Sequence, residues 1–92
     1  MVTVLSKIKR AIRNGGYQVG EHCLQEIAAD KLTLAEVISS ILNANEFDKL
    51  TDDESHIRYK LYGLSSSERE IVVVVFFSKG TLFLKTVYET SF

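Results

Sequence analysis

The sequence contains one continuous apolar run, Ile71-Val72-Val73-Val74-Val75-Phe76-Phe77, composed of β-branched and aromatic residues. Such residues favour extended backbone, and an unbroken apolar run is typical of a strand that is buried on both faces. Residues 71–77 are therefore predicted to form the central strand of a sheet, with partners in the neighbouring segments.

Three more strand candidates surround this run. Residues 56–62 alternate between apolar and polar side chains, which is the pattern of a strand with one polar face. Residues 81–90 are rich in Thr, Phe, Val and Tyr, and residues 47–50 suit a short strand at the edge. Because short hairpin loops are predicted between the long strands, we expect three or four antiparallel strands.

Three amphipathic helices are predicted before these strands. Apolar residues recur at helical spacing over residues 4–12, and a second such pattern begins at residue 20 or 21. The third helix opens with Thr33 and Glu36, whose spacing is that of a capping box. Residues 17–19, between the first two helices, are too few for a periodic pattern.

The whole chain, residues 1–92, is expected to be a single α+β domain, in which two to three N-terminal helices pack on a three- to four-stranded antiparallel sheet. The formal net charge of -1 gives no global positive field, so any site for a polyanion must be local. Residues 1–14 are predicted to contain an amphipathic helix, and they offer no apolar stretch for secretion or for spanning a membrane. This predicts a cytoplasmic protein without membrane contact.

One face of the predicted sheet gathers polar and aromatic side chains. Hairpin loops of four residues at 65–68 and two residues at 79–80 fix the register that places them together. The residues on this face are Arg58, Lys60, Tyr62, Thr86 and Tyr88. The expected cross-strand rows are Arg58–Val75–Leu84, Lys60–Val73–Thr86 and Tyr62–Ile71–Tyr88. Arg and Lys attract phosphate oxygens and Tyr rings stack on bases, so the face suits a phosphodiester. A slip of one residue in either hairpin would divide the group between the two faces.

A structural interpretation of the same residues stays open. His56, Arg58 and Lys60 also fit a solvated strand face whose charges discourage edge-to-edge aggregation. Thr86 and Tyr88 are common residues of strands.

His22 lies away from the apolar side of the second predicted helix. It is either a proton donor or acceptor that faces a groove, or an ordinary surface histidine. Cys23, the only cysteine, lies in the apolar stripe and is interpreted as a small buried hydrophobe. His22 and His56 fall on different elements without a ligand cluster, so neither a metal site nor a cofactor is predicted.

Five motifs carry a family resemblance. They are Tyr17-Gln18-Val19 with Glu21-His22, Lys31-Leu32-Thr33 with Glu36-Val37, Ile57-Arg58-Tyr59, Ile71 to Val75, and Lys85-Thr86-Val87-Tyr88. In this order they resemble the domain-of-unknown-function family 4258, a relative of the BrnT-type and RelE-type toxin folds, over about residues 17–88. Gln25 and Glu26 depart from the pattern, because such relatives usually have arginine after the histidine.

The resemblance implies a toxin-like, metal-independent endoribonuclease of a toxin–antitoxin system, similar to an mRNA interferase. Its catalytic candidates are His22, Arg58, Thr86 and Tyr88, and its substrate-binding candidates are Lys60, Tyr62 and His56. RNA, an antitoxin protein and a second copy of the chain are the expected partners. The alternative is a non-catalytic module of the same fold that binds a protein through its sheet face or first helix.

Overall fold

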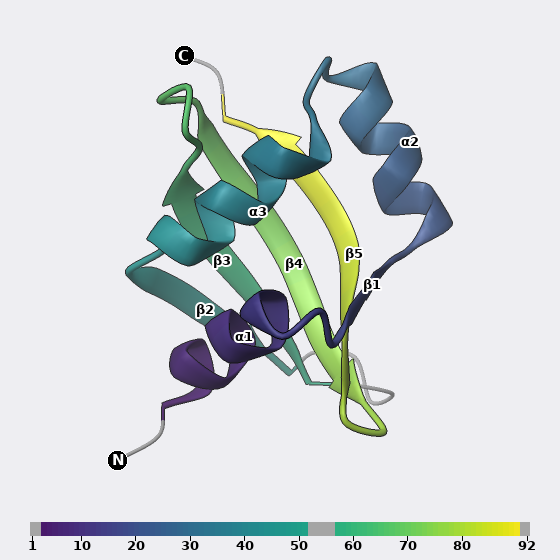
Figure 1. Cartoon of the computed structure of the whole chain (residues 1–92), viewed down its shortest axis with the longest axis vertical. Coiled ribbons are helices and arrows are strands. Elements are labelled where there is room, and N and C mark those ends of the chain that lie inside the picture. Colours follow the sequence, from purple (N-terminus) through teal and green to yellow (C-terminus); the bar gives the residue numbers. More distant parts are fainter. Residues whose placement is uncertain (1–2, 52–56, 91–92) are drawn as a thin grey trace.

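The computed structural model describes residues 3–51 and 57–90, which form three helices and one five-stranded sheet (Figure 1). The helices are α1 (Val4–Arg13), α2 (Glu21–Ala29) and α3 (Leu34–Asn43). The strands are β1 (Tyr17–Val19), β2 (Glu46–Leu50), β3 (Arg58–Leu64), β4 (Glu70–Ser78) and β5 (Thr81–Glu89). The predicted α+β class is confirmed, as are the three helices.

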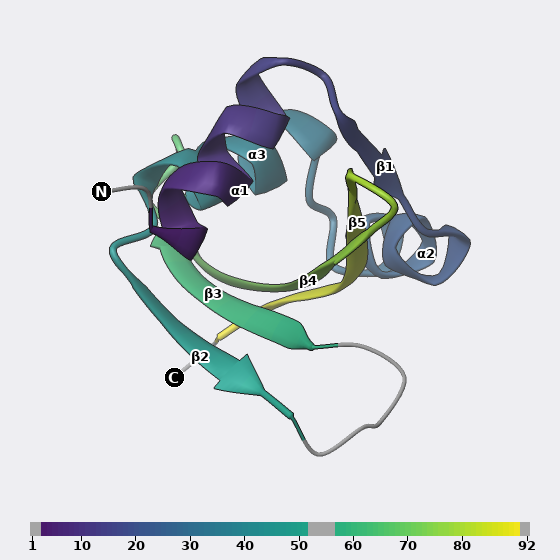
Figure 2. The same cartoon turned by 90° about the horizontal axis from the view of Figure 1, so that it is seen from below.

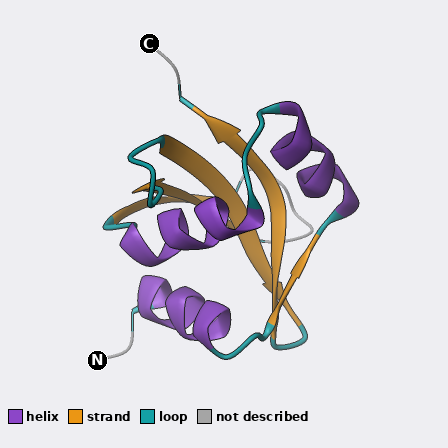
Figure 3. Cartoon of the chain, turned by 45° about the horizontal axis from the view of Figure 1, so that its top comes forward, coloured by secondary structure: helices purple, strands orange, loops and turns teal. Residues whose placement is uncertain are grey.

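The helices lie together on one side of the sheet (Figures 1 and 2). Helix α3 packs on β3 and β4, and α1 packs on α3 and β5. Helix α2 packs on β5, near one end of the molecule (Figure 3). None of the described helices covers the opposite side, which is named the open sheet face here (Figure 2).

The sheet differs from the prediction in size and direction. Its strand order is β1-β5-β4-β3-β2, and β1 pairs parallel to β5. The prediction of only three or four strands, all antiparallel, was therefore wrong. The added strand comes from residues 17–19, where Gly16 and Gly20 bracket the pairing through backbone bonds to Leu82 and Leu84. Three residues carry no periodicity, so the sequence pattern gave no sign of this strand.

Capping residues set the helix starts that the sequence predicts. The Oγ1 atom of Thr3 accepts a hydrogen bond of 3.1 Å from the Ser6 amide at the start of α1. Thr33 and Glu36 form both bonds of the predicted capping box, which satisfies two orphan amides of α3. No helix in the described part of the chain has the length and apolar character needed to cross a membrane.

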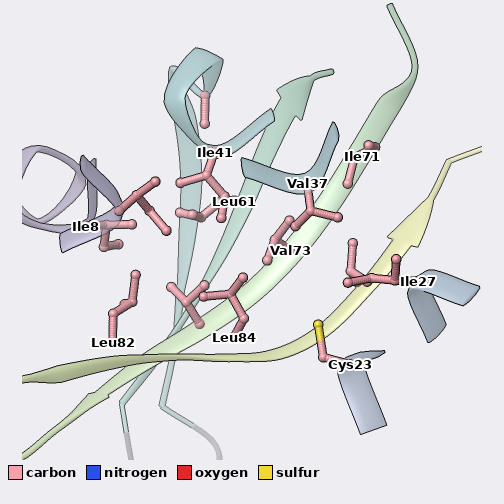
Figure 4. Close-up of a cluster of buried hydrophobic side chains, with 14 of the residues drawn as sticks. Ile8, Cys23, Ile27, Val37, Ile41, Leu61, Ile71, Val73, Leu82 and Leu84 are labelled. Carbon is pink, nitrogen blue, oxygen red and sulfur yellow. The ribbon is translucent and has the colours of Figure 1, made fainter. Parts of the chain in front are cut away.

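The hydrophobic core fills the space between the helices and the sheet (Figure 4). Strand β4 occupies the centre of the sheet, as predicted, and contributes Ile71, Val73 and Val75 to this core. From the helix side, Ile8 and Ile41 pack against them and are fully buried. Burial of each such side chain contributes about 1.5–3 kcal/mol, so the core holds the three helices to one face of the sheet.

The first long hairpin departs from the predicted four-residue loop. Ser65 pairs with Arg69 through a 2.9 Å backbone bond, which leaves a three-residue loop at residues 66–68. Glu68 ends this loop with a φ of 62°, which is a left-handed conformation that glycine or asparagine usually adopts. The register of β3 on β4 consequently shifts by one residue, so that Lys60 pairs with Val74 and not with Val73.

The second hairpin has the predicted two-residue turn. Lys79 and Gly80 have φ values of 52° and 81°, as a type I′ turn requires. Farther along, a β-bulge between Val74 and Val75 shifts the pairing of β4 with β5 by one residue. This shift compensates for the first hairpin, so Lys60 and Thr86 still lie in one row, as predicted.

Candidate functional site

Three of the predicted site residues meet on the open sheet face. The Nζ atom of Lys60, on β3, lies 5.7 Å from the ring centroid of Tyr62 and 5.8 Å from that of Tyr88 on β5. Both distances are within cation–π range. The shared row Tyr62–Val72–Tyr88 explains this meeting, because the two rings flank the same residue of β4.

The same side chains cover the centre of the open sheet face. Val72 and Val74 alternate with the core residues of β4 and have exposed fractions of only 2% and 6%. Both lie outside the core cluster that the helices cover. Lys60, Tyr62 and Tyr88 therefore shield an apolar floor, and Tyr88 stays exposed enough, at 37%, to meet a ligand.

A hydrogen bond holds the Tyr62 hydroxyl at one side of this cluster. The Tyr62 hydroxyl donates a 2.6 Å hydrogen bond to Asp48 on β2, and this bond raises the pKa of Tyr62 above its ordinary value. Hydrogen bonding to Tyr88, followed by charge interactions with both tyrosines, raises the pKa of Lys60. Lys60 is therefore a stable cation at neutral pH, suited to a phosphate oxygen.

Thr86 and His22 meet indirectly, through Glu26. The Glu26 carboxylate on α2 accepts a hydrogen bond from the Thr86 hydroxyl and another, at 3.1 Å, from the Val87 amide. Its second oxygen lies 3.4 Å from Nε2 of His22, one helical turn earlier. The carboxylate thus joins α2 to the edge of β5 and orients the imidazole, which is 73% exposed as the predicted helix face requires.

Arg58 lies at the other end of the same strand face. It occupies β3 two residues before Lys60 and is paired with Phe76, which is in turn opposite Phe83. The expected alignment of Arg58 with Val75 and Leu84 was wrong, because the loop at residues 66–68 shifts β4 by one position. Phe76 and Phe83 stack with their ring centroids 5.3 Å apart.

Carboxylates mark the opposite end of this face. Tyr62 lines a groove of about 580 Å³ together with Asn43, Glu46 and Glu70. A phosphate is repelled by this acidic groove, whereas Arg58 and Lys60 attract it. An anionic strand would therefore lie toward the Arg58 end of the open sheet face.

The structure does not gather all predicted site residues at one point. Lys60, Tyr62 and Tyr88 form one cluster, and His22 and Thr86 form another through Glu26. Among the described residues, no contact joins His22 to the lysine–tyrosine cluster. The prediction for His56 lies outside the described residues.

Cys23 is fully buried, as its place in the apolar stripe predicts. Burial raises the pKa of its thiol to about 11, so it is not a nucleophile near neutral pH. The apolar spacing of this helix also predicts that Leu24 belongs to the buried stripe, but Leu24 is half exposed.

Glu26 and Asp48 are the site residues that sequence reasoning missed. Glu26 follows His22 at the helical spacing of four residues, a spacing at which side chains meet, and this signal was available. Asp48 required the pairing of β2 with β3, which places it opposite Lys60. No family model, curated protein or solved structure matches the chain at a significant level.

Proposed function

We propose that the chain is a toxin-like, metal-independent endoribonuclease that holds RNA against the open sheet face. The observation that carries the proposal is the position of Lys60 between Tyr62 and Tyr88, with Arg58 on the same strand face. The two cations attract the phosphodiester and the exposed tyrosine ring stacks on a base. The resemblance to family 4258 supports the same activity.

The reaction that fits these groups uses the 2′-hydroxyl of the substrate as nucleophile. Its oxygen bonds to the adjacent phosphorus, and the bond from phosphorus to the 5′ oxygen breaks. Tyr88 and His22 move the protons: one removes the proton of the 2′-hydroxyl and the other supplies a proton to the leaving 5′ oxygen, while Lys60 and Arg58 stabilise the extra negative charge. The products are a 2′,3′-cyclic phosphate and a 5′-hydroxyl end, and no metal ion takes part.

Induced expression tests the proposal in cells. We expect the wild-type chain to arrest growth and fragment RNA, and Arg58→Ala or His22→Ala to abolish both effects, provided that each variant accumulates to the same level. A positioned acid–base group contributes about 10²–10⁴-fold and an electrostatic donor about 10²–10³-fold, so either loss is large enough to restore growth. Fragmented RNA in cells that express the Arg58→Ala variant would contradict this mechanism.

We further propose a RelE- or BrnT-like relationship for the fold and an antitoxin as its partner. The helices leave the open sheet face uncovered, so a partner that lies across Lys60 and Tyr88 would block RNA. A neighbouring reading frame that encodes a small protein able to relieve the growth arrest would support this relationship.

A non-catalytic module of the same fold is the second candidate. Glu26 favours it, because this carboxylate is committed to Thr86 and Val87 at the position where ribonuclease relatives usually have arginine. Such a module would bind a protein through the open sheet face and leave RNA intact. A stable complex with a protein from its own cells, with no effect on RNA, would favour this function over the first.

A further inference from the structure

A second anion-attracting surface lies on the helix side of the molecule. A groove of about 530 Å³ runs between α1 and the β4–β5 turn, and it is lined by Lys7, Arg10, Asn14, Phe77 and Gly80 among others. The groove is separate from the open sheet face, because α1 packs on the side of the sheet that carries the core.

This groove lies in the most basic part of the chain. Residues 3–20 contain four basic side chains and no acidic one. Lys7, Arg10 and Arg13 are exposed, and within residues 3–51 and 57–90 none of them forms an ion pair. Lys79 is exposed beside Gly80, which lines the groove, and adds a third cation to Lys7 and Arg10 there. A chain with a net charge of -1 thus carries a local positive surface.

Helix stability accounts for only part of this pattern. Arg10 and Arg13 lie in the last turn of α1, where a cation interacts favourably with the helix dipole. Lys7 lies in the N-terminal half of α1, where the helix dipole does not stabilise a cation. The dipole also gives no reason for the half-buried Phe77 to line the groove.

We propose that this groove, defined by Lys7, Arg10, Asn14 and Phe77, binds the backbone of single-stranded RNA. A positive groove that carries an aromatic ring is the combination by which proteins hold single strands without sequence preference. Lysine and arginine neutralise phosphates, the Asn14 amide donates a hydrogen bond, and the Phe77 ring stacks on a base. An acidic peptide would use the cations but would gain nothing specific from the ring. The proposal concerns binding alone and holds whether or not the chain cleaves RNA.

Binding to an RNA that cannot be cleaved tests the groove directly. The probe is a fluorescent 12-nucleotide 2′-O-methyl RNA, which lacks the free 2′-hydroxyl that the proposed cleavage requires, and the readout is anisotropy from low to moderate salt. The groove variant is Lys7→Gln with Arg10→Gln. Its matched control is Lys31→Gln with Lys49→Gln, which removes the same two charges from exposed positions elsewhere.

We expect the groove variant to bind about tenfold more weakly and the control variant to bind like wild type. Loss of two phosphate contacts should also lower the slope of log affinity against log salt by about 1.4, at about 0.7 per contact. Phe77→Leu keeps an apolar side chain in the core and should weaken binding without changing this slope.

Three outcomes would overturn the proposal. They are an equal loss of affinity in the groove and control variants, no binding by folded wild type at low salt, and tighter binding of poly-glutamate than of RNA. Because the probe has no free 2′-hydroxyl, its binding is measured apart from cleavage. Failure of the ribonuclease proposal would appear as intact natural RNA with normal binding of the probe, which is distinguishable from failure of the groove.

Discussion

Glu26 is the single residue whose contacts join the candidate site to the fold. Its carboxylate accepts from the Val87 amide and from the Thr86 hydroxyl, and it lies beside His22. Strand β5 has lost its β1 partner at this point, because the parallel pairing ends at Leu84. The carboxylate therefore replaces the missing strand as acceptor for an edge amide.

Removing this carboxylate should expose that amide. Glu26→Ala is expected to destabilise the fold by about 1–3 kcal/mol, because the Val87 amide loses its partner. Hydrogen exchange at the Val87 amide should accelerate in the variant. Thr86→Val serves as control, since it removes the Thr86 hydroxyl and leaves the hydrogen bond from the Val87 amide to Glu26 in place. Unchanged protection of the Val87 amide in Glu26→Ala would contradict this assignment.

Gly63 allows α3 to approach β3 closely. A Cβ atom at this position would lie 2.0 Å from the carbonyl oxygen of Ser40 and 3.3 Å from the Ala44 amide nitrogen, both on the backbone. Gly63→Ala should therefore destabilise the fold by about 1–3 kcal/mol in urea unfolding, because the helix must move outward. At Gly16 the nearest atom is 3.8 Å away, so Gly16→Ala should change stability by less than about 1 kcal/mol. Equal effects of the two substitutions would refute the close-packing account.

Some contacts of the candidate site could be predicted from the sequence, and others could not. The alternation of residues 56–62 identified Lys60 and Tyr62 as residues of one strand face, and the structure confirms their meeting with Tyr88. The link from His22 to Thr86 could not be predicted in the same way. It depends on how α2 packs against β5, and no periodicity within either segment encodes that contact.

At the scale of elements, the loop between β3 and β4 is anchored by Arg69. The guanidinium donates to Glu89 at 2.7 Å and 2.8 Å and to the backbone carbonyls of Asp30 and Lys31, and it lies 3.5 Å from Glu36. Ser67 of the same loop donates to Glu36 at 2.6 Å. These bonds join the loop to α3, to the end of α2 and to β5.

This network predicts a dependence of stability on pH. The Arg69 guanidinium lowers the pKa of Glu89, and the Ser67 hydroxyl, with Arg69 as a smaller cause, lowers that of Glu36. A carboxyl whose pKa is lowered in the fold stabilises the folded state at pH values above its ordinary pKa of 4.5. This contribution is lost as the pH falls through the lowered pKa.

Arg69→Gln should therefore reduce the loss of folding stability that occurs as the pH falls. Urea unfolding between about pH 7 and pH 2.5 should give a shallower decline for this variant than for wild type. Lys49→Gln removes an exposed cation outside the network and should follow wild type. Parallel curves for wild type and Arg69→Gln would exclude the network as the cause.

Some features of the helices, strands and turns could be predicted from the residue types within one segment, and others could not. The capping box of α3, the central strand β4 and the turn at Lys79-Gly80 each depend on residue types within one segment, and each prediction is confirmed. Burial of the β4 run extends over residues 71–75, whereas Phe76 and Phe77 are half buried. The loop at residues 66–68 was mispredicted because Glu68, and not glycine, takes the left-handed conformation. The bulge in the pairing of β4 with β5, between Val74 and Val75, restored the predicted rows of Lys60 and Tyr62 by a compensating shift that the sequence did not predict.

At the scale of the whole molecule, charge is distributed unevenly although the total is near zero. The basic residues of α1 lie on the helix side, the cations of β3 lie on the open sheet face, and Glu46 and Glu70 line the acidic groove at the sheet end. The sequence prediction that a polyanion site must be local agrees with this separation. Added salt should therefore weaken RNA binding without changing the fold.

The measurement that tests the central claim most directly is cleavage of single-stranded RNA by the purified chain in excess EDTA. Wild type should produce fragments with 2′,3′-cyclic phosphate ends. Lys60→Gln, which removes the cation between the two tyrosines, should lower the rate by about 10²-fold or more, whereas Lys49→Gln on the neighbouring strand should not. Intact RNA with folded wild type, or equal cleavage by wild type and Lys60→Gln, would contradict a ribonuclease site on the open sheet face.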